Sequence, residues 1–415
     1  MTGTDLSPGV RRATRATYLA FTGGGFAFAN WASRIPQVRS ELGLDPAALG
    51  LVLLAIAAGS VLSLPLTGPL IARIGSRRTV TGMSALLGVS LLVVAAGSTT
   101  GVPVLVVGLF VMGLANGGWD VGMNVQGAAV EQRLGRAIMS RFHAGWSLGT
   151  VVGALLGAAM IALDVPVPAH LAAVGVLIAV GVPLAVRGFL PDRADDADDG
   201  PRGGALAAWR EPRTLLVGLF VLAFAFAEGT ANDWLSVALI DDHGASAAVG
   251  TLGFAAFLTA MTAARWVGPP LLDRYGRVPV VRLLAGLAVG GLLLFVFGPT
   301  PELVFAGALL WGAGTSLGFP VGMSAAADDP ARAASRVSVV ASVGYCAFLG
   351  GPPLIGFLGH QVTVLRALLV VAVLLAVATA LAGALRPRPT PDRRCEGVGS
   401  TPTGRAGRGP VRIVP

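Results

Sequence analysis

Long apolar segments recur along the whole chain and are separated by short polar stretches. Breaks at charged, proline-rich or glycine-rich positions divide the chain into twelve spans, at residues 15–33, 47–71, 79–98, 102–129, 141–162, 168–187, 214–238, 246–268, 279–298, 302–325, 335–358 and 363–385. About 20 helical residues cross a hydrocarbon core of roughly 30 Å, so each span is long enough to be a transmembrane helix. The pattern predicts an all-α membrane protein with twelve transmembrane helices.

Composition supports the membrane class. Of 415 residues, 54% are hydrophobic and only 13% are charged, whereas soluble domains are about 25% charged. The net charge of +8 would indicate nucleic acid in a soluble protein. Here the basic residues, all of them arginines, lie in short segments between the spans, so we expect a lipid surface and no nucleic-acid partner.

The arginines also predict an orientation. With a cytoplasmic amino terminus, all but four of the 30 arginines fall in cytoplasmic segments; Arg34, Arg39 and Arg366 lie outside, and Arg265 lies near the inner end of the eighth span. Positive residues concentrate on the cytoplasmic side of membrane proteins. We therefore expect both termini in the cytoplasm. The absence of lysine indicates the codon composition of a GC-rich bacterial genome, so we expect the membrane to be the bacterial plasma (inner) membrane.

The two halves of the chain partly repeat. "GWDVGMN" (118–124) corresponds to "GFPVGMS" (318–324), and "RIGSR" (73–77) to "RYGRV" (274–278), each about 200 residues apart. Such repeats predict two pseudo-symmetric six-helix bundles related by an axis along the membrane normal. The predicted parts are a cytoplasmic tail (1–14), a first bundle (15–187), a linker (188–213), a second bundle (214–385) and a disordered cytoplasmic tail (386–415).

The fourth span carries a polar stripe. Asn116, Asp120 and Asn124 are four residues apart, which places them on one helix face. A carboxylate at mid-bilayer costs about 2.5–3.5 kcal/mol, so it should face protein or water. Because burial favours the neutral carboxyl group, we expect this stripe to couple protons or bind substrate. Two alternatives stay open: a gating relay to Arg73 or Arg77, and simple packing.

Other spans carry further candidates. Glu228 and Asn232, four residues apart on the seventh span, and Asn30 on the first are candidates for proton coupling or substrate binding, while Arg34 is expected at the outer rim. Candidates for lining a cavity are Trp31, Asp233, Trp234, His143, Ser342 and Tyr345. Asp233 and Trp234 could instead anchor the helix at the membrane interface, where tryptophan is common, and His143 could be interfacial.

"GPLIARIGSRR" (68–78) resembles the signature Gly-x-x-x-Asp-Arg-x-Gly-Arg-Arg of the major facilitator superfamily, and "LLDRYGR" (271–277) stands at the matching place in the second half. The resemblance implies a gating signature made of Gly68, Arg73, Gly75, Arg77, Asp273, Arg274, Gly276 and Arg277. In the family, the carboxylate and arginine of this signature tie neighbouring helix ends together in one conformational state. The first copy departs from the pattern, with Ala72 in place of Asp and Ser76 in place of Arg.

Within that superfamily, "DVGMNVQGAAVEQRLGRAIMSRFHAGWSLG" (120–149) resembles the branch with the fucose–proton symporter and the rhizopine-uptake protein. "EGTANDW" (228–234) and "GYCAFLGGPPLIG" (344–356) are similar to the rhizopine side of it. The resemblance implies functional roles for Asp120 and Asn124. It implies no proton site on the first helix, where Ala32 takes the place of the fucose transporter's carboxylate.

These features predict a secondary active transporter of a small polar solute, such as a sugar, polyol or inositol-like compound, working by alternating access with proton-coupled uptake. The alternative is a proton-coupled exporter of a drug-like or metabolic compound. We expect no enzyme, since His143 with Ser147 is the only local nucleophile–base pair and no acid is spaced to orient it. We expect no cofactor, no metal, and a monomer whose partners are the solute, protons and the bilayer.

Overall fold

The computed structural model describes residues 7–135, 138–191, 205–329 and 332–386. Residues 1–6 of the predicted first tail, 192–204 of the predicted linker and 387–415 of the predicted last tail lie outside the described residues. In the described part the regular structure is helical throughout.

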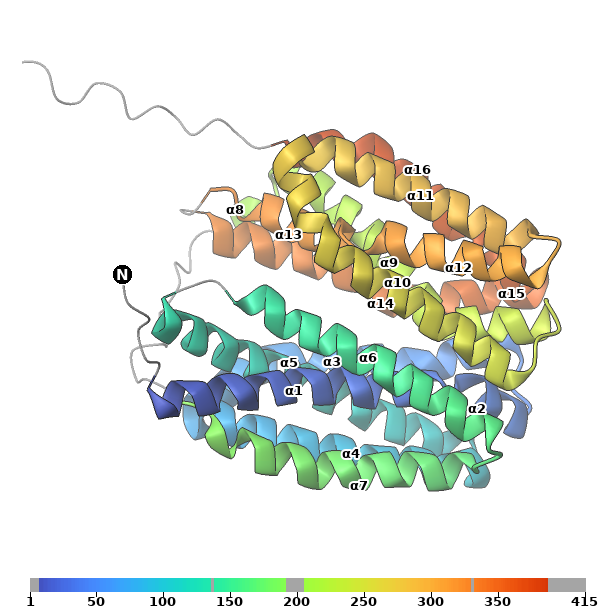
Figure 1. The fold of residues 1–415 in the computed structure, drawn as a ribbon, viewed down its shortest axis with the longest axis horizontal. Coiled ribbons are helices and arrows are strands. Elements are labelled where there is room, and N and C mark those ends of the chain that lie inside the picture. The colour runs from blue at the N-terminus through green and yellow to red at the C-terminus, as the bar shows by residue number, and fades with distance from the viewer. Residues whose placement is uncertain (1–6, 136–137, 192–204, 330–331, 387–415) are drawn as a thin grey trace, which may run out of the picture.

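The first half holds six long helices (Figure 1). They are α1 (Pro8–Ala32), α3 (Pro46–Ile74), α4 (Ser76–Thr100), α5 (Val102–Leu134), α6 (Met139–Ala162) and α7 (Val167–Ala185), with the short α2 (Ile35–Glu41) and the 3₁₀ turn η1 (Val186–Gly188).

The second half follows the same order after the short α8 (Ala205–Ala208). Its helices are α9 (Pro212–Asp241), α10 (Ala247–Tyr275), α11 (Arg277–Phe297), α12 (Pro301–Thr315), α13 (Gly318–Ala326), α14 (Ala333–Gln361), α15 (Val364–Ala367) and α16 (Leu369–Leu381), with the 3₁₀ turn η3 (Ala382–Leu385). Among the described residues, eleven helical segments are long and apolar enough to span a membrane, and α1 is the twelfth long helix. The predicted twelve-helix fold in two halves is confirmed.

Two predicted spans are interrupted. Within 363–385, Leu368 separates α15 from α16, and the other break lies in the tenth span. The sequence predicts a single helix over 302–325, but the structure ends α12 at Thr315 and begins α13 at Gly318. The reason is Pro320, which has no backbone N–H to donate to the carbonyl four residues earlier, that of Ser316. The first half has Asp120 at the matching position of its repeat, and α5 runs through it unbroken.

Two glycines make matching sharp turns in the halves. Gly75 ends α3 and Gly276 ends α10, with φ of 84° and 79°. Only glycine adopts this left-handed region without strain, which accounts for the two glycines that the sequence places in the repeated signature.

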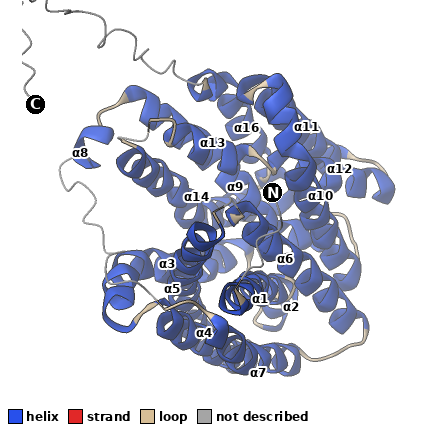
Figure 2. Cartoon of the chain, turned by 60° about the vertical axis from the view of Figure 1, so that its left-hand side comes forward, coloured by secondary structure: helices blue, strands red, loops and turns tan. Residues whose placement is uncertain are grey.

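The halves pack against each other through two helix pairs, α3 with α14 and α6 with α10. Small residues allow the close approach: a Cβ on Gly50 would lie 2.5 Å from the carbonyl oxygen of Pro352, and one on Gly356 would lie 2.4 Å from that of Pro46. Figure 2 shows α4 and α7 at the outer edge of the first half, away from this interface.

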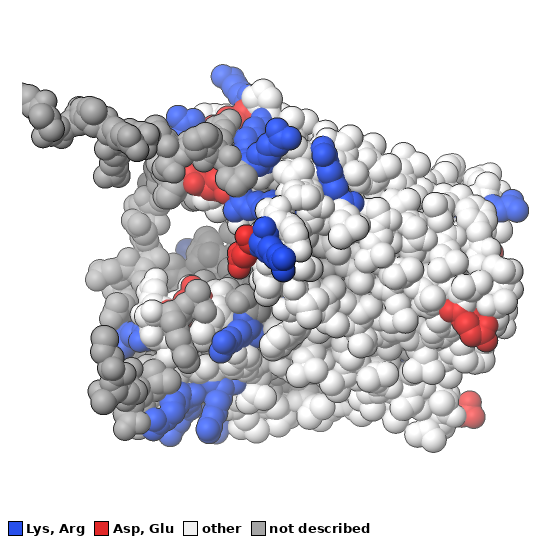
Figure 3. All heavy atoms as spheres, turned by 45° about the horizontal axis from the view of Figure 1, so that its top comes forward, with Lys and Arg blue, Asp and Glu red and all other residues white. Residues whose placement is uncertain are grey.

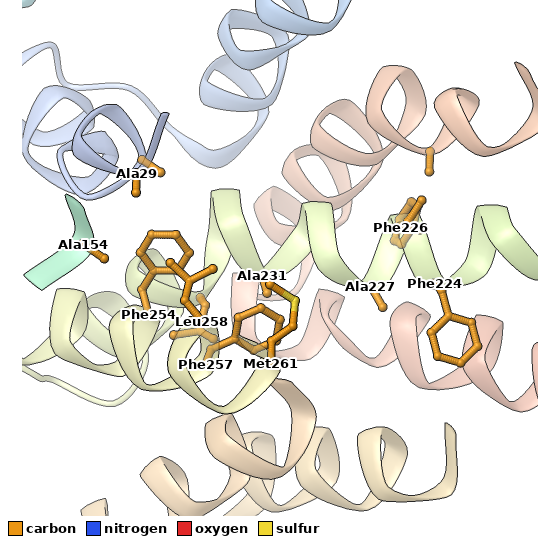
Figure 4. Close-up of a cluster of buried hydrophobic side chains, with 14 of the residues drawn as sticks. Ala29, Ala154, Phe224, Phe226, Ala227, Ala231, Phe254, Phe257, Leu258 and Met261 are labelled. Atoms are coloured by element: carbon orange, nitrogen blue, oxygen red, sulfur yellow. The ribbon is translucent and has the colours of Figure 1, made fainter. Parts of the chain in front are cut away.

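The buried core continues across the interface. In Figure 4, Phe254 and Leu258 of α10 lie beside Ala231 of α9, with Ala29 of α1 and Ala154 of α6 close to them. All five side chains are buried. Apolar packing of α1 and α6 against α9 and α10 therefore joins the two halves.

We call the end that carries the start of α1 (Arg11, Arg12 and Arg15) the arginine-rich end, and the opposite end, at α2, the far end. Figure 3 shows basic side chains concentrated towards one end of the molecule. At the far end, Arg39 forms an ion pair with Asp241, and His360 Nδ1 lies 3.6 Å from Asp45 Oδ2.

Two further hydrogen bonds cross between the halves. The Thr251 hydroxyl donates to the Ser33 carbonyl near the far end (3.4 Å), and Arg265 reaches Ser147 at mid-depth (3.5 Å). No hydrogen bond or ion pair joins described residues of the two halves at the arginine-rich end. Figure 1 shows the halves spreading apart towards that end.

The second half has a charged network at the arginine-rich end. Arg336 donates to Glu211 at 2.7 Å, and Asp328 accepts from Arg213 at 2.8 Å and from Arg277 at 2.6 Å. The hydrogen bonds from Arg336 hold the pKa of Glu211 at about 2, below the ordinary glutamate value.

The first half uses neutral groups at the corresponding place. Gln126 Nε2 donates to the Ser76 hydroxyl at 2.7 Å and to the Leu190 carbonyl at 2.8 Å. Ser76 stands where the second half has Arg277. The departure from the signature that the sequence displays is therefore matched by different contacts, in which the neutral side chains of Ser76 and Gln126 take part.

Candidate functional site

A cavity of about 340 Å³ lies between the two halves. Its walls come from α1, α3, α5 and α6 of the first half and from α9, α10, α13 and α14 of the second. Its polar lining consists of Ser60, Asn116, Asp120, Ser147, Thr150, Glu228, Asn232, Asp233, Arg265 and Tyr345. Pockets that bind small molecules commonly measure about 300–1,000 Å³, so the cavity is large enough for a small solute.

The polar stripe of α5 faces this cavity. Asn116 and Asp120 line it, while Asn124 stands one turn further along and supports the carboxylate. Asn124 Nδ2 donates to Asp120 Oδ1 at 3.2 Å and to the Asp120 carbonyl at 2.8 Å. No arginine pairs with Asp120 among the described residues, so the contact to Arg73 or Arg77 that a gating relay requires is absent from this conformation.

Among the described residues, Glu228, unlike Asp120, forms an ion pair with an arginine. Its Oε2 accepts a hydrogen bond from Arg265 Nη2 at 2.9 Å, and about a quarter of each side chain is exposed. From the sequence we expected Arg265 near the inner end of its helix and predicted no role for it. An arginine inside an apolar span is itself an indication of function, and that signal was available in the sequence.

The break between α12 and α13 fixes Arg265. Pro320 leaves the Ser316 carbonyl without a helical donor, and Arg265 Nε donates to this oxygen at 3.0 Å. Arg265 Nη1 also reaches Ser147 Oγ of α6 at 3.5 Å. One guanidinium group thereby connects the acidic residue of α9, the helix break and the opposite half.

Two more polar groups of α9 lie in the cavity. The Oδ1 atom of Asn232 is buried and has no hydrogen-bond partner. Asp233 lines the cavity and has no ion-pair partner among the described residues. Asp120 and Asp233 therefore present unpaired carboxyl groups to the cavity from opposite halves.

Besides Asn124, five predicted candidates do not line the cavity, and two of these five form part of the hydrophobic core. Trp31 and Trp234 are buried in the core. His143 packs edge-on against Phe21, with ring centroids 5.0 Å apart. Ser342 donates to the carbonyl of Ser338, one turn before it on α14.

The remaining one, Asn30, belongs to a buried polar network. Its Oδ1 lies 2.7 Å from His170 Nε2, and Arg34 Nε donates to the other nitrogen of that ring at 2.9 Å. Arg34 also donates to the Val165 carbonyl at 2.9 Å and is only 2% exposed. Arg34 lies at the far end, next to α2, but it is not an exposed rim residue, because the loop after α6 and the start of α7 cover it.

The gating-signature residues lie at the arginine-rich end. Arg277 bonds to Asp328 and to the Ser324 hydroxyl, and Arg274 lies over the Tyr275 ring, 5.2 Å from its centroid. Asp273 is exposed and, like Arg73 and Arg77, forms no ion pair with a described residue. A Cβ on Gly68 would meet open space.

Comparison with known sequences gives the family. The profile described as Major Facilitator Superfamily matches residues 17–236 and 219–405, which covers nearly the whole chain. The chain belongs to the major facilitator superfamily. It is therefore a multi-pass membrane transporter and not an enzyme.

Two relatives align over nearly their full length. An uncharacterised transporter of Sinorhizobium fredii is 33% identical over 90% of this chain and 98% of its own. The membrane protein MosC of Rhizobium meliloti is 31% identical over 92% of each chain. The resemblance seen in the sequence is thus confirmed at the level of the superfamily.

Solved structures of the superfamily have the same fold. The nucleoside transporter NupG superposes with a TM-score of 0.70 at 15% identity, over 90% of this chain and 98% of its own. A variant of the E. coli fucose:proton symporter FucP superposes with a TM-score of 0.61 at 16% identity, over 90% and 98%. At these identities the likeness establishes the fold alone.

Proposed function

We propose that this transporter carries a small polar solute of the sugar, polyol or inositol-like class, by alternating access and with proton-coupled uptake. The observation that carries the proposal is the position of Asp120. Its carboxyl group faces the cavity between the halves and has no cationic partner among the described residues. A proton is the simplest species that can neutralise such a group when the cavity excludes water.

The solute's hydroxyl groups find partners on both sides of the cavity. Asn116 and Asn232 each offer an amide that can donate and accept, and the buried Oδ1 of Asn232 lacks a partner until a donor arrives. The Glu228 carboxylate and the Arg265 guanidinium together offer acceptors and donors, as neighbouring hydroxyl groups of a polyol require. Binding of one solute to both halves favours their closure around it.

We assign the arginine-rich end to the cytoplasm of a bacterial inner membrane. The concentration of arginines at that end supports this orientation. The Arg39–Asp241 ion pair joins the halves at the far end, where His360 also lies 3.6 Å from Asp45. In this orientation the structure corresponds to an inward-facing state, in which the cavity is closed to the outside.

Transport by purified protein in proteoliposomes tests the proposal. A pH gradient, acidic outside, should drive accumulation of the solute by the wild type, and Asp120→Asn should abolish the dependence on the gradient. Asp164→Asn is the matched control, because the same chemical change is made at an exposed loop residue with φ of 52°, a conformation that asparagine tolerates. Equal gradient-driven accumulation by wild type and Asp120→Asn would remove the proton role of Asp120.

A further inference from the structure

A second recess lies far from the transport cavity. It measures about 680 Å³ and lies where the start of α4 meets the end of α7 and η1, at the arginine-rich end of the first half. It is lined by Arg77, Arg78, Thr81, Gly82, Pro183 and Arg187. We call it the α4–α7 recess.

No described residue compensates the positive charge of this recess. Arg77, Arg78 and Arg187 are exposed and form no hydrogen bond or ion pair with any described residue, and no carboxylate of the described part of the chain lines the recess. Arg77 and Arg78 also occupy the first turn of α4, where the helix dipole disfavours cations and favours anions. Three arginines without an acidic partner among the described residues, two of them in a first helical turn, therefore favour the binding of an anion.

The second half provides an internal comparison. There α11 also begins with basic residues, but Arg277 is bonded to Asp328 and Ser324, and Arg282 Nε donates to the Thr379 carbonyl of α16 at 3.3 Å. The protein satisfies these arginines with its own groups. Among the described residues, the three arginines at the same end of the first half have no such partner.

The surroundings of the recess suit an amphiphile. α4 and α7 form the outer edge of the first half (Figure 2). Along α7, away from Arg187, Leu184, Val180 and Leu177 are each at least half exposed. An apolar track in the membrane region therefore leads up to the charged recess, so a ligand with an anionic head and an acyl chain contacts both.

We propose that the α4–α7 recess binds the phosphate headgroup of an anionic phospholipid, whose acyl chain lies along the exposed face of α7. The three guanidinium groups donate to the phosphate oxygens, with the Thr81 hydroxyl within the same recess. Gly82 leaves room for the headgroup, since a Cβ at this position would meet nothing within 4 Å. Basic recesses between membrane helices are established sites for such headgroups.

Native mass spectrometry of the detergent-purified protein tests this, with phosphatidylglycerol and phosphatidylcholine of identical acyl chains as probes. The wild type should retain phosphatidylglycerol in preference. The double variant Arg78→Gln/Arg187→Gln should bind it roughly 25-fold more weakly, since each basic residue at an anionic lipid surface contributes on the order of fivefold. The control Arg282→Gln/Arg366→Gln removes the same charge outside the recess and should bind within about twofold of the wild type.

A second variant keeps the charges and fills the space. Gly82→Trp should fold, because its side chain points into the open recess, and should lose the bound phosphatidylglycerol. If the double arginine variant does not fold, Gly82→Trp still tests whether the recess binds the lipid. Equal retention of both lipids by the wild type, or unchanged retention by the variants, overturns the proposal. Displacement of the lipid by inorganic phosphate at equal concentration also overturns it, since the recess would then be a site for a soluble anion.

Discussion

Glu228 of α9 and Arg265 of α10 form an ion pair of 2.9 Å inside the cavity, and the same arginine is bonded to Ser316 at the break between α12 and α13. Replacing either residue by glutamine leaves the other charge uncompensated in a partly enclosed site. Loss of one partner from a fully buried pair costs about 3–5 kcal/mol. We expect about 1–2 kcal/mol here, since a quarter of each side chain is exposed.

The measurement is a double-mutant cycle on the thermal unfolding of the purified protein. Glu228→Gln and Arg265→Gln should each lower the midpoint, and the double variant should be more stable than the sum of the two losses predicts. Purely additive effects would show that the pair does not act as a unit.

Pro320→Ala tests how the helix break positions Arg265. Alanine restores a backbone N–H that can bond to the Ser316 carbonyl, which now accepts from Arg265 Nε at 3.0 Å. We expect weaker solute binding with an unchanged or higher thermal midpoint, because the helix gains a hydrogen bond while the guanidinium group loses its anchor. Isothermal titration with the transported solute measures the binding. A matched change at Pro301→Ala, in the first turn of α12, should leave it unaltered.

The Arg39–Asp241 ion pair should control access to the cavity from the far end. Asp241→Arg places a like charge against Arg39 and should favour separation of the halves at the far end. In a cysteine-free background, a cysteine at Ala57 of the cavity wall should then react faster with an impermeant maleimide added on that side. The charge swap Arg39→Asp/Asp241→Arg should restore the slow reaction, and failure of the swap to do so would exclude the pair as a closing contact.

The Glu211–Arg336 contact should make the thermal stability of the protein depend on pH in the acidic range. The pKa of Glu211 is held at about 2, below its unfolded value near 4.5, chiefly by hydrogen bonds from Arg336. A lowered pKa contributes stability that is fully present above about pH 4.5 and is lost as the pH falls towards 2. The thermal midpoint of wild type should therefore fall over this window more than that of Glu211→Gln. Parallel curves for the two proteins would contradict the assignment.

The helices could be predicted well from the sequence, because a long apolar segment in lipid must satisfy its backbone N–H and C=O groups by hydrogen bonds within the segment, and only a helix does so. It also placed Asn116, Asp120, Glu228, Asn232 and Tyr345 among the candidates that the structure brings to one cavity. These residues face the cavity because polar groups at membrane depth avoid lipid.

Contacts between distant segments could not be predicted in the same way. Asn30 and His170 are 140 residues apart and meet because α1 packs against α7. The bond between Arg265 and the Ser316 carbonyl, 51 residues away in the chain, depends on the helix break at Pro320. Neither relationship leaves a periodic pattern, since each depends on how helices pack and not on which face of one helix is polar.

The central claim is that a proton on Asp120 is coupled to movement of the solute. Two transport modes of the same proteoliposomes separate coupling from binding: accumulation driven by a pH gradient, and exchange of labelled for unlabelled solute at equal pH. The account predicts that Asp120→Asn loses gradient-driven accumulation and keeps exchange, because a permanently neutral side chain still permits the loaded protein to move between its two states. Gradient-driven accumulation at the wild-type level in Asp120→Asn would contradict the account.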